Sequence, residues 1–190
     1  MQQARQSLSG KWGLAIGAFF VFVLICIIAG SVPKVGVLIS LLVTGPLVLG
    51  IVIFSLAISR GTGAKFEQIF EGFNQFGRAL VAYLLIALFT ILWSLLLIVP
   101  GIIASLSYSQ TFFIMADDGS IGVGDAIKKS KKMMYGYKWK YFCLKLRFLG
   151  WAILSILTLG IGLLWLLPYV QISQAKFYDD IKGPVQNVVA

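Results

Sequence analysis

Residues 79–116 form a run of thirty-eight residues without a charged side chain. A helix rises about 1.5 Å per residue, so about twenty apolar residues cross the hydrocarbon core of a bilayer. The run is therefore long enough for nearly two crossings, and Pro100-Gly101 near its middle signals a turn. This pattern predicts a transmembrane hairpin with spans at residues 79–98 and 102–117.

The composition of the whole chain agrees with a membrane protein. Hydrophobic residues make up 59% of the 190 residues, and the mean hydropathy is +0.92. A water-soluble domain of this size has too small an interior to bury so much apolar surface. The net charge is +9. Because the basic residues lie next to apolar runs, this charge favours anionic lipid headgroups over nucleic acid as the partner.

Further apolar segments predict additional spans. Residues 13–32 and 35–59 form a first hairpin, in which Gly45-Pro46 is interpreted as a kink. In the last third, residues 139–158 and 161–177 form a pair, with a single span plus an interfacial segment as the alternative. We therefore expect an all-α membrane protein with six transmembrane helices, arranged as three hairpin units at about residues 1–62, 63–124 and 125–190.

Short similarities between the hairpins indicate a triplicated unit. Tyr108-x-Gln110 in the fourth predicted span recurs as Tyr169-x-Gln171 in the sixth. An apolar-x-Gly step precedes each hairpin, at Leu8-x-Gly10, Phe70-x-Gly72 and Met134-x-Gly136. Three such steps in register with three hairpins favour an internal repeat. The alternative is that apolar spans simply look alike.

The basic residues set the predicted orientation. Of the sixteen Lys and Arg residues, Lys34 alone lies in a predicted outside turn. The positive-inside rule therefore places both termini and the two long loops in the cytoplasm. We expect a multi-pass protein of the bacterial cytoplasmic membrane, since a five-span chain would export its basic C-terminal tail.

The two long loops have the 3.6-residue period of amphipathic helices. In the loop at residues 66–80, four phenylalanines share one face with Ile69, and in the loop at residues 123–137 the lysines lie opposite Ile127 and Met134. We expect both to be helices in the cytoplasmic interface. The lysines expected to bind anionic lipid are Lys128, Lys129, Lys131, Lys132, Lys138 and Lys140. The alternative is that they only anchor and orient the bundle.

A search for catalytic chemistry gives a negative result. The chain has no histidine, no phosphate-binding glycine loop and none of the common hydrolase motifs. Asp117-Asp118 and Asp179-Asp180 close similar spans and could face one another around a divalent ion or as an acid and a base. Polar helix ends are the simpler interpretation. We therefore expect no enzyme activity, no catalytic residues, no metal and no cofactor.

Polar side chains gather in the fourth and sixth predicted spans. Those that could line a groove open to the cytoplasm are Ser105, Tyr108, Gln110, Tyr169, Gln171 and Gln174. Polar groups in lipid must find partners, so hydrogen-bonded packing between helices is the alternative. No ionisable side chain is expected inside the bilayer unless Lys145 or Arg147 turns inward, which argues against coupling to protons or cations.

Several longer motifs resemble a known family. They are Ala4-Arg5-x-x-Leu8-x-Gly10-x-Trp12, Gly45-Pro46-Leu47-x-Leu49-Gly50, Phe70-Glu71-Gly72-Phe73, Trp93-Ser94-Leu95-Leu96-x-x-x-Pro100-Gly101-Ile102, Lys138-Trp139-Lys140 and Gly160-Ile161-Gly162-Leu163-Leu164-Trp165-Leu166-x-Pro168-Tyr169. Over nearly the whole chain they resemble a bacterial integral-membrane family of unknown function, which is distantly similar to the membrane domain of some glycerophosphodiester phosphodiesterases. The resemblance implies a polytopic membrane protein and supplies no catalytic residues. The chain has no phosphodiesterase domain, so that activity is not implied.

These observations lead to two functional hypotheses. The first is a non-enzymatic scaffold or accessory factor of the bacterial envelope that binds anionic lipid or a membrane partner. The second is a small transporter or lipid-moving protein that uses the polar groove. The expected partners are membrane lipids with anionic headgroups, together with another membrane protein or a second copy of the chain, and not nucleic acid.

Overall fold

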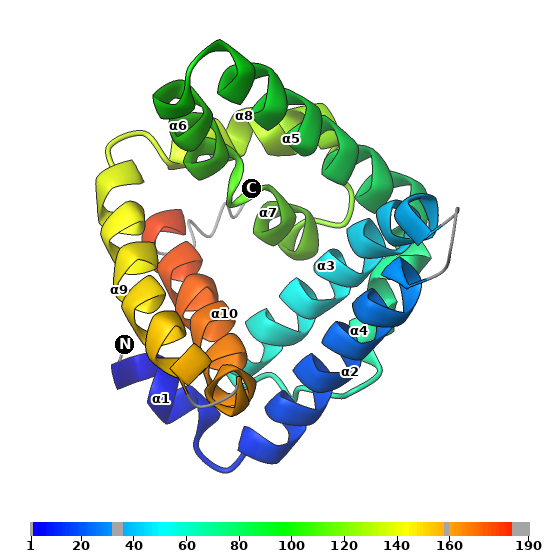
Figure 1. Ribbon diagram of the computed structural model, residues 1–190, viewed down its shortest axis with the longest axis vertical. Helices are drawn as coiled ribbons and strands as arrows, with labels where there is room; N and C mark the ends of the chain where they lie inside the picture. Colours follow the sequence, from blue (N-terminus) through cyan, green and yellow to red (C-terminus); the bar gives the residue numbers. More distant parts are fainter. Residues whose placement is uncertain (1, 32–35, 158–159, 184–190) are drawn as a thin grey trace, which may run out of the picture.

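The computed structural model describes residues 2–31, 36–157 and 160–183, and these are mostly helical (Figure 1). The α-helices are α1 (Gln2–Leu8), α2 (Trp12–Gly30), α3 (Gly36–Arg60), α4 (Gln68–Glu71), α5 (Phe76–Leu96), α6 (Ile98–Tyr108), α7 (Thr111–Asp117), α8 (Val123–Met133), α9 (Lys138–Leu157) and α10 (Ile161–Lys182). A 3-10 helix, η1 (Gly72–Gln75), joins α4 to α5. No strand occurs in these ranges, so the all-α class is confirmed for them. The predicted turn at Lys34 lies outside the described residues.

Four segments in the described part of the chain are long and apolar enough to cross a membrane: Trp12–Gly30, Gly36–Arg60, Gln68–Leu96 and Ile98–Asp117. They correspond to the first four predicted spans. Figure 1 shows α9 and α10 side by side along one edge of the molecule, close to the predicted fifth and sixth spans. These two helices are more polar, and α9 has four basic residues in its first three turns. Six spans therefore stay a prediction.

α3 is the helix around which the others pack. From Gly45 to Ser59 it is almost entirely buried. It contacts α1, α2, α4, η1, α5, α7 and α10, and Figure 1 shows α2 along one side of it with α7 near the other. Phe54, Leu47 and Leu49 are among the largest fully buried side chains of the described chain. Neighbouring helices, rather than lipid, therefore surround most of α3.

Two glycines allow one chain segment to lie directly against α3. A Cβ at Gly50 would lie 1.8 Å from the carbonyl oxygen of Ile69, and a Cβ at Gly72 would lie 1.9 Å from that of Pro46. The backbone of α4 and η1 therefore touches the backbone of α3, a contact that any larger residue would prevent. We call this contact between Gly50, Gly72, Ile69 and Pro46 the glycine seam.

The glycine seam corrects the prediction for residues 66–80. The expected single amphipathic helix is instead α4 followed by η1, and α5 begins at Phe76. Ile69 is fully buried, whereas the four phenylalanines of this segment are exposed. The segment lies beside the middle of α3, because Gly50 is near the midpoint of that helix. Hydrophobic periodicity did not reveal this position because it weighs side chains and ignores where two glycines let backbones meet.

The second hairpin turns earlier than predicted, and its second helix is interrupted. Leu97 is extended between α5 and α6, so Pro100 lies in the first turn of α6, where its missing N–H is not needed. A second interruption at Ser109-Gln110 separates α6 from α7. The predicted fourth span is therefore not one continuous helix. By contrast, α3 continues through Pro46, as expected of a position that does not break the helix.

Three pairs of consecutive helices, α2 with α3, α5 with α6 and α9 with α10, each have a close contact at a glycine near the turn that joins them. In each pair the glycine lies in the first turn of the second helix, and its partner lies in the last turn of the first helix. In all three, an added Cβ would come within 3.0 Å of the partner. The glycines and their partners are Gly36 with Gly30, Gly101 with Ser94, and Gly162 with Ser155.

Candidate functional site

Exposed basic and aromatic side chains gather on α8 and at the start of α9. Tyr135 and Trp139 are 83% and 74% exposed, which is unusual for large aromatic side chains in water. We define the basic-aromatic surface as Lys128, Lys129, Lys131, Lys132, Tyr135, Trp139 and Lys140. Five of the six lysines predicted to meet anionic lipid are exposed here, and the sixth, Lys138, is half-buried.

The sequence of α8 separates its two faces, as its 3.6-residue period predicts. Ala126 and Ile127 are buried, while the lysines are exposed. Asp125 lies in the first turn and Lys132 in the last, an arrangement that suits the helix dipole. Gly136, with φ +84°, turns the chain from α8 into α9, in a conformation that glycine adopts without strain.

The charge of this surface is available to an external anion. Lys128 lies 3.7 Å from Asp125, and both side chains are more than 70% exposed, so this pair is weak. The other lysines of the surface take part in none of the ion pairs among the described residues. Lys140 lies 6.0 Å from the ring centroid of Phe177, and Trp139 stacks on Phe142 at 5.5 Å. The Phe177 ring thus makes a cation–π contact with Lys140 at the edge of the surface.

Ser130 joins the buried face of α8 to the interruption between α6 and α7. Its hydroxyl donates to the carbonyl oxygen of Ser107 at 2.7 Å and accepts from the backbone N–H of Gln110 at 3.2 Å. Both backbone groups are buried where the helix stops, and an unpaired buried backbone group is costly. One serine therefore bonds to both sides of the interruption and joins α8 to Ile98–Asp117, the fourth of the segments that are apolar enough to cross a membrane.

The six residues predicted to line a polar groove lie in different surroundings. Tyr108 packs against Phe89 at 6.0 Å, and Tyr169 packs against Phe148 at 5.6 Å. Gln110 is fully buried; its Nε2 donates to the hydroxyl of Ser109 at 3.0 Å, and its Oε1 has no partner among the described residues. The others, Ser105, Gln171 and Gln174, are half-buried. A common groove stays a prediction.

Asp117 and Asp179, from the two acidic pairs, meet around Arg60. The guanidinium lies 2.6 Å from Asp117 Oδ1 and 2.7 Å from Asp179 Oδ1. Lys182 also pairs with Asp117, and the hydroxyl of Tyr178 donates to the same carboxylate at 3.0 Å. Burial, followed by the charge of Asp117, raises the pKa of the Tyr178 phenol, which keeps this donor protonated. These residues, the Arg60 cluster, join the ends of α3, α7 and α10.

The Arg60 cluster settles how the two carboxylates interact. The Arg60 guanidinium bridges Asp117 and Asp179, so the two carboxylates form salt bridges that link α3, α7 and α10. Within the described residues, no three or more His, Cys, Asp or Glu side chains group as metal ligands. Asp118 bonds instead to Ser120, and Asp180 is exposed. Sequence reasoning brought the acids together but missed their arginine partner.

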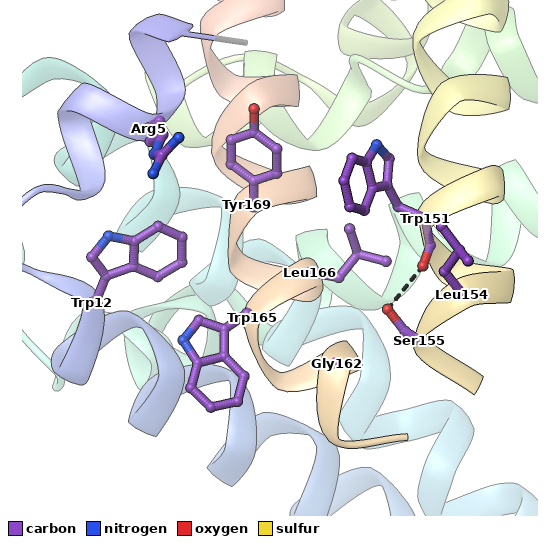
Figure 2. A pocket seen from close by; sticks show the side chains of 9 residues that line it. All are labelled: Arg5, Trp12, Trp151, Leu154, Ser155, Gly162, Trp165, Leu166 and Tyr169. Atoms are coloured by element: carbon purple, nitrogen blue, oxygen red, sulfur yellow. Dashed lines mark hydrogen bonds between the residues drawn. The ribbon is translucent and has the colours of Figure 1, made fainter. Parts of the chain in front are cut away.

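A pocket of about 570 Å³ opens between α1, the start of α2, the end of α9 and the start of α10 (Figure 2). It is lined by Arg5, Trp12, Trp151, Leu154, Ser155, Gly162, Trp165, Leu166 and Tyr169. Three of the chain's five tryptophans are in this lining. The sequence analysis did not predict that these three tryptophans share a site. Their positions near the ends of apolar segments were the available signal, but tertiary packing decides that they meet.

Comparison with known families identifies the family of the chain and no relative of known structure. The family model described as "Protein of unknown function (DUF975)" matches residues 1–105 and 95–184, so the chain belongs to this family. No curated protein and no solved structure matches the chain. The membership predicted from the motifs is confirmed at the level of a family of unknown function. The distant similarity to phosphodiesterase membrane domains stays a prediction.

Proposed function

We propose that this member of the DUF975 family is a non-enzymatic, multi-pass membrane protein of the bacterial envelope that binds anionic lipid headgroups through its basic-aromatic surface. The observation that carries the proposal is the exposure of four lysines on α8 beside Tyr135 and Trp139, while the opposite face of α8 is anchored in the protein. Each lysine near an anionic surface adds about 1 kcal/mol of attraction. Trp and Tyr side chains favour the headgroup region. The surface therefore suits the cytoplasmic leaflet.

Ser130 connects this lipid contact to the membrane-embedded part of the protein. Lipid bound to the lysines fixes α8, and α8 is bonded through Ser130 to the interruption at Ser109-Gln110. Anionic lipid thereby sets the position of the fourth membrane segment, Ile98–Asp117, relative to the cytoplasmic surface of the membrane. In a scaffold or accessory factor, this would keep the same part of the protein at the same depth in any membrane rich in anionic lipid.

Lipid titrations of the purified protein test the proposal. By native mass spectrometry, we expect phosphatidylglycerol to bind more tightly than phosphatidylcholine. Replacing the four α8 lysines with Gln is expected to reduce this preference by about tenfold or more. Replacing the same four with Arg keeps the charge and should keep the preference. Equal binding of both lipids, or an unchanged preference in the Gln variant, contradicts the proposal.

The proposed topology has six spans, with α9 and α10 as the third hairpin and both termini in the cytoplasm. It is supported by the glycine contact that recurs in each helical pair, and by the location of fifteen of sixteen Lys and Arg residues on one predicted side. An epitope inserted after Gly160 should then be labelled from outside intact cells. Labelling only after permeabilisation would support four spans instead.

A second candidate function is a small transporter or lipid-moving protein. The interruption of the fourth membrane segment at Ser109-Gln110 favours it, because interrupted helices line substrate sites in transporters. The buried Oε1 of Gln110, without a partner among the described residues, adds a polar atom there. The test is exchange of a fluorescent phospholipid between leaflets of proteoliposomes. The function requires exchange that Gln110→Leu abolishes, and an absence of exchange contradicts it.

A further inference from the structure

The pocket between α1, α2, α9 and α10 combines apolar walls with one cation. Tryptophan and leucine side chains form much of the lining, and Arg5 is the single charged residue among the nine that line it. Figure 2 shows Arg5 and the hydroxyl of Tyr169 toward one end of the pocket and Gly162 toward the other. Arg5 is exposed and takes part in none of the ion pairs that the described residues form. The pocket therefore has an apolar part and a positively charged end.

We infer that this pocket binds one acyl chain of an anionic phospholipid, with Arg5 holding the phosphate group at the charged end. Its volume of about 570 Å³ lies within the usual range for ligand pockets. Apolar walls favour a hydrocarbon chain, because binding removes the walls and the chain from water and brings them into close van der Waals contact. A guanidinium can donate two parallel hydrogen bonds to a phosphate. The inference goes beyond the proposed function, since this pocket lies at the other end of α9 from the basic-aromatic surface.

The charge of Arg5 distinguishes this ligand from others that an aromatic pocket suits. Tryptophan and tyrosine cages bind quaternary ammonium ions through their ring faces. A guanidinium in the same lining repels such a cation, and no acidic side chain among the lining residues offsets it. A bilayer is the favoured source because Trp151 and Trp165 are 59% and 51% exposed, so the walls are open to surrounding chains. Tryptophans of this kind gather at membrane interfaces.

Brominated lipids test the inference because bromine on an acyl chain quenches tryptophan on contact. In a Trp93→Phe, Trp139→Phe background, the three remaining tryptophans are those of the pocket. The protein is reconstituted in vesicles that contain equal mole fractions of brominated phosphatidylglycerol or brominated phosphatidylcholine. We expect the anionic lipid to occupy the pocket about fivefold more tightly, and so to quench more strongly at low mole fraction.

Three variants show whether Arg5 is responsible for this preference. Arg5→Gln should bring quenching by the two lipids to the same level, while Arg5→Lys keeps the charge and most of the preference. Lys65→Gln is the matched control, because it removes one charge from an exposed residue outside the lining and should change nothing. Arg5 is exposed, so its variants are expected to fold; gel filtration and circular dichroism verify this.

Three results would overturn the inference. They are equal quenching by both phospholipids in the protein with Arg5, a preference that survives Arg5→Gln, and quenching by a brominated free fatty acid in place of the phospholipid. The last result would assign the pocket to a different ligand. A failure here is distinguishable from a failure at the basic-aromatic surface, because replacing the α8 lysines leaves Arg5 in place.

Discussion

α3 and α9 are both long helices with many hydrophobic side chains, yet these side chains are covered in different ways. Between Gly45 and Ser59, α3 is enclosed by other helices. α9 packs mainly against α10 and more weakly against α6, and leaves Leu146, Leu149 and Trp151 exposed. In α3 the hydrophobic side chains form a protein core, whereas in α9 several of them are exposed. Hydrophobic side chains in these two helices therefore have different surroundings, and only the packing reveals which.

Glycines in the two helices differ in the same way. A Cβ at Gly50 of α3 would overlap the backbone of α4, whereas a Cβ at Gly150 of α9 would meet no atom within 4 Å. The fold therefore depends on the sequence of α3 at individual positions. At Gly150 of α9 a larger residue has room.

The largest effect is expected at Gly50. In Gly50→Ala the new Cβ has no room beside the Ile69 oxygen, so we expect a loss of about 3 kcal/mol or more in the free energy of unfolding. Detergent gel filtration should show loss of the monodisperse peak. Gly150→Ala is the matched control, and it should be neutral or stabilise by up to about 1 kcal/mol. Equal melting temperatures for the two variants would remove the distinction between α3 and α9.

An intermediate effect is expected where α3 meets α7 and α10. Arg60→Gln leaves Asp117 and Asp179 without their shared guanidinium. Because these side chains are only 13% and 27% exposed, water replaces that partner poorly. We expect the free energy of unfolding to fall by about 1 to 3 kcal/mol, measured as a lower melting temperature. Asp125→Asn removes the exposed pair with Lys128 and should cost less than about 1 kcal/mol. Similar small shifts in both would mean that the Arg60 cluster does not hold the helix ends together.

A smaller effect is expected at Ser130, on the buried face of α8. Ser130→Ala removes the hydroxyl that bonds to Ser107 and Gln110, at a cost of about 1 to 2 kcal/mol. Hydrogen exchange of the Gln110 amide should quicken. Ser105→Ala is the control, because among the described residues that hydroxyl bonds only to Ile102, within its own helix. An unchanged exchange rate at Gln110 would contradict the connection between α8 and the fourth membrane segment.

The hydrophobic pattern could predict four long apolar helical segments and the faces of α8, because these depend on length, composition and period. It could not predict which backbones touch. For residues 66–80 it placed Ile69 on one face with four phenylalanines, whereas the structure buries Ile69 and exposes the phenylalanines, since Gly50 and Gly72 admit the backbone there. The pattern also missed α1, whose short polar sequence has no strong apolar period.

The residues of the candidate sites also divide into those that the sequence could predict and those that it could not. The exposed lysines of α8 follow from charge and helical period, so they could be predicted. Asp117 and Asp179 were expected to meet, but Arg60 lies 57 positions before Asp117, and no local signal links them. Trp12 and Trp165 come from opposite ends of the chain and share a pocket because α1 packs on α10. Such long-range contacts are set by tertiary packing and leave no periodicity in the sequence.

The surroundings of Trp139 test the contact between α8 and an anionic leaflet most directly. In a variant whose other four tryptophans are replaced by Phe, Trp139 alone reports on the basic-aromatic surface. In vesicles that contain phosphatidylglycerol, we expect its emission to shift to shorter wavelength and its quenching by aqueous acrylamide to fall, relative to vesicles of phosphatidylcholine alone. Equal and strong quenching by acrylamide in both kinds of vesicle would show that this surface faces water, which would contradict the proposed binding of anionic lipid.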